Sequence, residues 1–142
     1  MKSGREQAVL ALSGKSLFQT GQRMPARDAD WQGIYEECCQ QAVPALAWKS
    51  VDREALPKEL ADRWKDTVVA QAYHSLQVTW QHLQVHELME QAEIPYVILK
   101  GCASAAYYPA PLERTMEDVD FLVRPQDLAR AGKVLEAEGF VP

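Results

Sequence analysis

The chain has 142 residues, with 15 Lys and Arg against 20 Asp and Glu, which gives a formal net charge of −5. A composition of 47% hydrophobic and 25% charged residues is that of an ordinary globular protein, and this length can bury a core without disulfides or metals. The negative charge argues against long nucleic acids and anionic membranes as partners, because clustered Lys and Arg hold both. The three cysteines, including the adjacent Cys38 and Cys39, match neither a disulfide framework nor a C-x-x-C metal site. With no signal-like or membrane-spanning segment visible, we expect a cytoplasmic protein.

The first third of the chain predicts short helices. Glu6 to Leu12 predicts a short helix, and Gly14 to Arg27 predicts a loop. The segment from Asp28 to Trp31 supplies capping carboxylates ahead of apolar residues with 3, 4, 7 spacing, which predicts a helix. Pro44 breaks or restarts this helix, and Ala45 to Val51 forms a second short apolar piece.

A stretch without Gly or Pro, from Lys58 to Glu93, follows Pro57 and predicts a helix about 54 Å long if it is straight. At 100° per residue, its apolar residues do not share one face. An early ladder comprises Leu60, Trp64, Val68, Ala72, Leu76 and Trp80, and a later set comprises Val78, Val85, Leu88, Met89 and Ala92. We expect that the helix bends or breaks near Leu76 to Trp80, or that its two halves pack against different bodies.

The character of the sequence changes at residue 94, where β-forming and turn residues begin to alternate with helical segments. The predicted elements are a buried strand at 95–99, a short helix at 102–108, a strand at 118–123, a helix from Pro125 to Glu138 capped by Gly139, and a strand opening near Phe140. This order predicts an α+β protein. We expect a helical region over residues 1–93, followed by part of a mixed-sheet core over residues 94–142.

Asp118-Val119-Asp120 is the first candidate for chemistry. In a strand, the two carboxylates lie on one face with their Cα atoms roughly 6.6 Å apart, while Val119 points into the core. Two like charges at this separation repel by about 2 kcal/mol at an effective dielectric of 20, and a divalent cation between them removes the conflict. Carboxylates and phosphate oxygens are the ligands that Mg²⁺ takes, although the same pair could simply form a solvated strand edge.

Lys100-Gly101, between the first strand and the short helix, is the second candidate. A glycine at such a turn lets the backbone approach a ligand closely, free N–H groups at a helix start favour a phosphate, and Lys100 adds a mobile cation. Strand-Gly-helix turns are also common for purely conformational reasons. The combination of this turn, the helix and the paired aspartates on the next strand is more specific than either motif alone.

One set of residues in the second half of the chain matches a known family. It comprises Ile94 to Gly101, Ala105, Tyr108, Arg114, Asp118 to Val123 and Glu138 to Phe140, with a softer match upstream that includes Trp31, Ala42 to Pro44, Leu46 and the long helix. Together they closely resemble the uncharacterised bacterial nucleotidyltransferase family of the DNA polymerase beta superfamily.

The resemblance implies a nucleotidyltransferase fold with Asp118 and Asp120 as catalytic ligands of one or two Mg²⁺ ions. It implies that Lys100, Gly101 and Cys102 face a nucleoside triphosphate, and that Arg114 contacts phosphate or orders its loop. The implied reaction moves a nucleoside monophosphate from the triphosphate to an acceptor hydroxyl and releases pyrophosphate. The sequence does not identify the acceptor.

Two departures from the superfamily pattern stand out. Most members have Gly or Ser where this chain has Cys102, and they carry a third carboxylate on a later strand. The later acidic residues Asp127, Glu136 and Glu138 fall on or beside the last helix instead. We therefore expect the third carboxylate beyond Pro142, and little or no transferase activity from these residues alone. The alternatives are a non-catalytic nucleotide-binding member of the fold and a protein-interaction module that binds a partner through the N-terminal helices.

Other motifs have simpler interpretations. Ser13 to Ser16 resembles the end of a Walker A loop but lacks its first glycine and the strand that should precede it. His82, His86 and Glu90 have zinc-compatible spacing, but without a fourth ligand they are interpreted as a solvated helix face. The four tryptophans coincide with apolar helix positions and are interpreted as core residues; they are Trp31, Trp48, Trp64 and Trp80.

Overall fold

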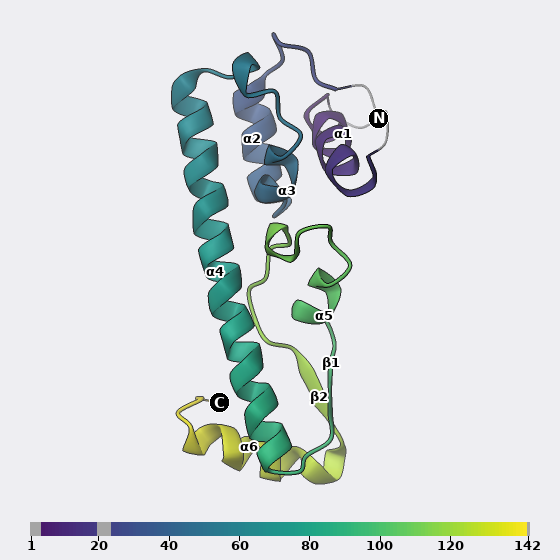
Figure 1. The fold of residues 1–142 in the computed structure, drawn as a ribbon, viewed down its shortest axis with the longest axis vertical. Coiled ribbons are helices and arrows are strands. Elements are labelled where there is room, and N and C mark those ends of the chain that lie inside the picture. The colour runs from purple at the N-terminus through teal and green to yellow at the C-terminus, as the bar shows by residue number, and fades with distance from the viewer. Residues whose placement is uncertain (1–3, 20–23, 142) are drawn as a thin grey trace.

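The computed structural model describes residues 4–19 and 24–141. Its helices are α1 (Gly4–Phe18), α2 (Trp31–Gln40), α3 (Pro44–Trp48), α4 (Lys58–Gln91), α5 (Cys102–Ala105) and α6 (Leu128–Ala137), with short 3-10 turns at Arg53–Ala55, Pro111–Glu113 and Pro125–Asp127. The strands are β1 (Tyr96–Ile98) and β2 (Phe121–Val123). Helices and a small antiparallel sheet in one chain agree with the predicted α+β class. In Figure 1, α4 runs along one side of the molecule, with α1 to α3 at one end and the sheet and α6 at the other.

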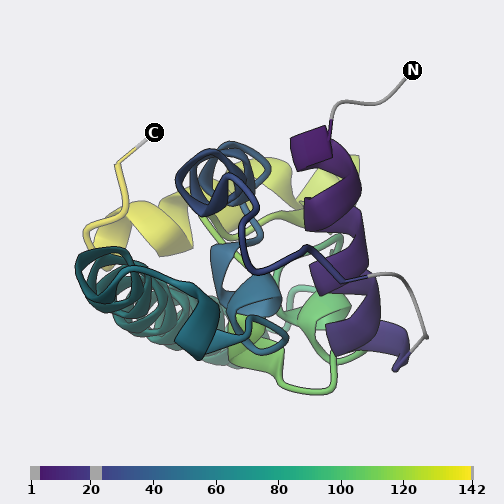
Figure 2. The same ribbon diagram turned by 90° about the horizontal axis from the view of Figure 1, so that it is seen from above.

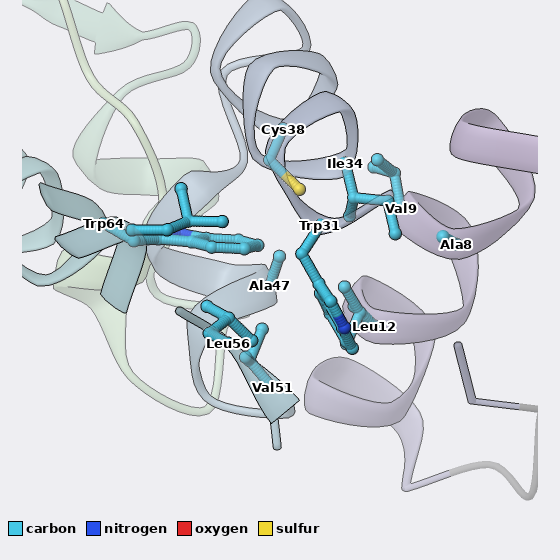
Figure 3. Packing of buried hydrophobic residues seen from close by; sticks show 11 residues of the cluster. Ala8, Val9, Leu12, Trp31, Ile34, Cys38, Ala47, Val51, Leu56 and Trp64 are labelled. Carbon is cyan, nitrogen blue, oxygen red and sulfur yellow. The ribbon is translucent and has the colours of Figure 1, made fainter. Parts of the chain in front are cut away.

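The first helices pack around a hydrophobic core, here called the N-terminal cluster. It comprises Ala8, Val9, Leu12, Trp31, Ile34, Cys38, Ala47, Val51, Leu56, Leu60 and Trp64. Side chains from different helices converge on this cluster in Figure 3, and α3 contacts both α1 and α4 (Figure 2). Asp30 caps α2 as predicted, because its carboxylate accepts a hydrogen bond from Gly33 N at 3.0 Å. Pro44 starts α3, also as predicted.

Helix α4 is continuous, and its two halves pack against different bodies, which confirms the second of the two expectations. Leu60 and Trp64 belong to the N-terminal cluster. Further along, Val85 and Met89 pack with Ile94 and Ala131 in a second group, the sheet cluster. Val78, Ala105 and Met116 form a third group, the small cluster, between these two. The predicted boundary at residue 93 stays a prediction, since α4 contributes to both ends of the molecule.

The opposite face of α4 carries exposed apolar side chains, here called the α4 stripe. They are Val69 (59% exposed), Tyr73 (64%), Leu76 (53%), Trp80 (61%) and Leu83 (50%). Their 4-3-4-3 spacing places them on one side of the helix, away from the buried Ser75, Val78 and Val85. The interpretation of all four tryptophans as core residues is therefore wrong for Trp80, because its position lies on the outer face.

The sheet pairs β1 with β2 in antiparallel register, Tyr96 opposite Val123 and Ile98 opposite Phe121. One face packs on the sheet cluster through Tyr96, Phe121 and Val123. The other face exposes Val97, Leu99 and Leu122, so the prediction of a buried strand is wrong for one of its two faces. Phe140 packs on the sheet cluster, and no strand is formed at that position within residues 4–19 and 24–141.

The first helix is longer than the sequence predicts, because α1 spans Gly4–Phe18 and not only Glu6 to Leu12. The predicted loop from Gly14 begins later, because α1 continues to Phe18, while residues 20–23 of that loop lie outside the described residues. Ser16 explains the longer helix, since its buried hydroxyl donates to Leu46 O at 2.7 Å and lies 2.6 Å from Ser50 Oγ. No helix in the described ranges is both long enough and apolar enough to span a membrane.

Candidate functional site

Asp118 and Asp120 lie in the extended segment that leads into β2. The predicted strand at 118–123 begins only at Phe121, but Leu99 N still donates to Asp120 O at 3.1 Å and extends the pairing with β1. Val119, between the two aspartates, packs inward on the sheet cluster and the small cluster. The alternation of an extended chain then turns both carboxylates toward the other side. Their side chains are 64% and 31% exposed.

Lys100, at the end of β1, reaches both carboxylates. Its Nζ lies 2.7 Å from Asp120 Oδ2 and 3.6 Å from Asp118 Oδ1. The hydrogen bond to Asp120 and the charges of both aspartates raise the pKa of Lys100 above its ordinary value. The same hydrogen bond from Lys100 lowers the pKa of Asp120. The ammonium group therefore reduces the repulsion that two neighbouring carboxylates create.

Gly101 forms a tight turn between Lys100 and α5. Its φ of +63° and ψ of −121° belong to a region that side chains with a Cβ atom rarely adopt. A Cβ atom built there would lie 2.7 Å from His82 Nε2, so the turn is also packed closely against α4. The structure confirms that this position requires glycine for conformational reasons.

A hollow of about 190 Å³ opens beside the turn. It is lined by Ala42, Lys100, Gly101, Arg114, Thr115, Met116, Glu117 and Asp118. Arg114 donates through Nη1 to Thr115 O at 3.1 Å, a contact that orders its own loop. The structure thus places Lys100, Gly101, Arg114 and Asp118 around one space, with Asp120 joined to them through Lys100.

The N-terminal helices hold the loop that carries Arg114. Thr115 Oγ1 donates to Ala42 O at 2.6 Å, and Ser75 Oγ on α4 donates to Arg114 O at 3.4 Å. Lys49 forms an ion pair with Glu113 at 3.1 Å. The helices therefore help to fix one wall of the hollow.

Cys102 contributes differently from the other predicted residues. Its thiol lies 3.8 Å from Thr79 Oγ1 and 4.0 Å from Met116 Sδ, so it contacts α4 and the small cluster. Cys102 does not line the hollow beside the turn, and its predicted contact with a nucleotide stays a prediction.

Comparison with known proteins supports one family. The family model described as an uncharacterised nucleotidyltransferase matches residues 27–142. The chain belongs to this family. The match confirms the resemblance and extends it through the N-terminal helices as far as residue 27. No curated protein and no solved structure matches the chain. Membership in this family supports nucleotidyl transfer as the general chemistry of the protein.

The donor set at Asp118 and Asp120 fits a magnesium ion of the kind that nucleotidyl transfer uses. Mg²⁺ is usually held by one or two carboxylates, with phosphate oxygens and waters completing its coordination. No group of three or more His, Cys, Asp and Glu side chains within the described residues could hold a metal by itself. An ion bound to these two aspartates would therefore take its remaining ligands from nucleotide and water.

His82 is the residue at this site that the sequence interpretation missed. The sequence predicts a solvated helix face for His82, His86 and Glu90. His86 and Glu90 are exposed, but His82 is only 5% exposed and lies against Gly101. Burial lowers the pKa of His82, opposed by the Asp118 carbonyl and by both carboxylates. Neither ring nitrogen makes a regular hydrogen bond with the described residues. The sequence feature that indicates burial of His82 is its place in a series with 3-4-3-4 spacing. The series comprises the buried residues Ser75, Val78, His82, Val85 and Met89.

Proposed function

We propose that this nucleotidyltransferase transfers a nucleoside monophosphate from a nucleoside triphosphate to an acceptor hydroxyl, with Mg²⁺ bound by Asp118 and Asp120. The observation that carries the proposal is the convergence of Lys100, Asp118 and Asp120 within 3.6 Å beside the Gly101 turn. Two carboxylates and a cation from separate segments suit a ligand that brings both metal and phosphate. Family membership supports the same class of reaction.

The residues of the chain contribute positioning and charge. In the proposed reaction the acceptor oxygen attacks the α-phosphorus, the bond from that phosphorus to the pyrophosphate oxygen breaks, and the acceptor proton is released. Lys100 and Arg114 bring positive charge to the phosphates, and the absence of a side chain at Gly101 allows close approach. Asp118 and Asp120 would hold Mg²⁺, which supplies charge neutralisation at the phosphate oxygens.

Replacement of Asp120 by Asn tests the proposal in the full-length protein. The variant is expected to lose Mg²⁺-dependent nucleotide transfer, measured as pyrophosphate release, and to bind Mg²⁺ more weakly by calorimetry. Asp66→Asn is the matched control, because Asp66 is an exposed aspartate on α4 whose substitution changes the charge equally. Unchanged transfer and unchanged Mg²⁺ affinity in Asp120→Asn would rule out the metal assignment.

The α4 stripe favours a second candidate, a protein-interaction module. Exposed apolar side chains at 4-3-4-3 spacing are typical of a helix that pairs with another helix. On this hypothesis, Trp80→Asp weakens association with a partner while nucleotide binding persists. The double variant Asp118→Asn/Asp120→Asn has the opposite effect, because it removes the metal ligands and leaves the stripe intact. Co-sedimentation and nucleotide titration of the two variants distinguish the candidates.

A further inference from the structure

Lys100 occupies a position that conflicts with the metal proposed for the same site. Its Nζ is 2.7 Å from Asp120 Oδ2 and 3.6 Å from Asp118 Oδ1, so one ammonium contacts both prospective metal ligands. A carboxylate oxygen that is already paired with an ammonium at 2.7 Å is a poorer ligand for a second cation. An ammonium and Mg²⁺ a few ångströms apart also repel each other. Lys100 and the metal therefore compete for the pair.

The Lys100 side chain can adopt a second position, in which its ammonium points into the neighbouring hollow. Its side chain is 53% exposed and sits on a flexible four-carbon stem, so it can leave the aspartates without disturbing the core. The hollow beside it is lined by Lys100 itself, Gly101 and Arg114. A phosphate in that hollow would compete with the carboxylates for the ammonium, because its charge of about −1.5 to −2 is similar to that of the two aspartates together.

We propose that Lys100 is a built-in counter-ion of Asp118 and Asp120, which phosphate binding withdraws so that the metal can enter. This inference rests on the proposed function. It makes metal and phosphate binding cooperative through one side chain, and thermodynamic linkage requires that each ligand favours the other by the same factor. In the absence of phosphate, Lys100 keeps the affinity of the aspartates for a lone divalent ion low.

A counter-ion and the simpler roles of Lys100 predict different changes in Mg²⁺ affinity when the lysine is removed. A lysine that only binds phosphate would lower phosphate affinity when removed and would leave the affinity for Mg²⁺ alone unchanged. A lysine that only stabilises the turn would, when removed, lower thermal stability and weaken both ligands. A counter-ion predicts opposite changes: Lys100→Met binds Mg²⁺ more tightly and phosphate more weakly than the wild type.

Separate titrations test this prediction in the full-length protein, with Mg²⁺ alone and with inorganic pyrophosphate alone, both by calorimetry. Lys100→Met is expected to bind Mg²⁺ roughly two- to five-fold more tightly, the range of an exposed ion pair, and to bind pyrophosphate more weakly. Lys100→Arg keeps the positive charge and is expected to retain the wild-type affinity for Mg²⁺. Lys58→Met is the charge-matched control, because Lys58 lies far from the site. It precedes His82, the α4 residue that packs on Gly101, by 24 residues, about 36 Å along the helix.

The outcomes separate the inference from the function on which it rests. Unchanged or weaker Mg²⁺ binding by Lys100→Met overturns the counter-ion role, and if Asp120→Asn still loses the metal the proposed function stands. An equal gain in Lys58→Met shows a general effect of net charge, and an equal gain in Lys100→Arg shows that the charge is irrelevant; each overturns the inference. A wild-type protein that binds no Mg²⁺ even when pyrophosphate is present overturns both proposals.

Discussion

The two ends of the molecule differ in how firmly they are packed. The N-terminal cluster joins side chains from several helices around Trp64, which is completely buried. The sheet at the other end packs on one face only, and the candidate site lies on short extended segments where the side chains of Lys100 and Asp118 are more than half exposed. Burial of apolar surface is the dominant source of stability, so most of it resides in the helical end. The site depends on that end, because α4 and the loop contacts of Thr115 and Ser75 connect the two.

Trp64→Ala provides the largest test of this contrast. Trp64 is 0% exposed, contacts Tyr35 and Trp48 with ring centroids 5.3 and 5.7 Å away, and donates to Pro44 O at 3.0 Å. Its truncation leaves a large cavity and removes the hydrogen bond to Pro44 O, so we expect a loss of about 3–5 kcal/mol in the free energy of unfolding. Urea denaturation followed by circular dichroism measures this loss.

Trp80→Ala is the matched control on the same helix. Trp80 is 61% exposed in the α4 stripe, and its truncation removes little buried surface. A change within about 0.5 kcal/mol is expected, as for surface substitutions in general. Similar losses in the two variants would contradict the contrast between the buried and the exposed face of α4.

The helical part of the fold was largely predictable, because its signals are local. Asp30 and Pro44 mark the ends of helices through capping and through the missing N–H of proline, and both act as predicted. The faces of α4 were harder to assign, since two apolar stripes run along it and only tertiary packing decides which one is buried. Trp80 and His82 were each assigned to the wrong environment for this reason.

The candidate site was predictable as a set of residues but not as an arrangement. The spacing of Asp118 and Asp120 and the glycine at position 101 predicted which residues would lie close together, and the structure brings them together. The ion pairs of Lys100 were not visible in the sequence, because they join the end of one strand to the approach of another. The packing of His82 on Gly101 likewise depends on where α4 passes the turn.

Gly101→Ala tests the rigidity of the site at its tightest point. Alanine would have to adopt a φ of +63°, and its Cβ atom would lie 2.7 Å from His82 Nε2. Strained backbone of this kind costs about 1–3 kcal/mol, so we expect a loss of that order in stability together with weaker binding of nucleotide. Thermal unfolding and nucleotide titration measure the two effects.

Gly132→Ala is expected to raise stability, whereas Gly101→Ala is expected to lower it. Gly132 lies within α6, and nothing approaches within 4 Å of a Cβ atom built there. Alanine favours the helix over glycine by about 1 kcal/mol, so a gain in stability is expected. Destabilisation by Gly132→Ala, or a neutral Gly101→Ala, would show that the two glycines are not distinguished by backbone conformation and contact.

The smallest expected effect is a change in how stability depends on pH, measured for His82→Gln. Burial lowers the pKa of His82 in the folded protein, so below its ordinary value of about 6.5 the unfolded chain binds more protons. Stability therefore falls as the pH decreases from about 6.5 toward the folded pKa. Glutamine does not titrate, and we expect the free energy of unfolding of the variant to decline less between pH 7 and pH 5, two values chosen to bracket the transition at about 6.5.

Two features of the molecule make the pH dependence of unfolding in this range specific to His82. The lowered pKa of Asp120 affects stability only at lower pH, because a carboxyl with a depressed pKa begins to lose its contribution as the pH falls toward about 3.9, the ordinary aspartate value. His74 is exposed on the same helix, so His74→Gln supplies a control that makes the same substitution at an exposed position. A wild-type slope in His82→Gln would mean that the folded protein protonates this ring as easily as the unfolded chain. The close packing of His82 on Gly101 would then not restrict its charge, and the site would be as open to water as the sequence alone suggested.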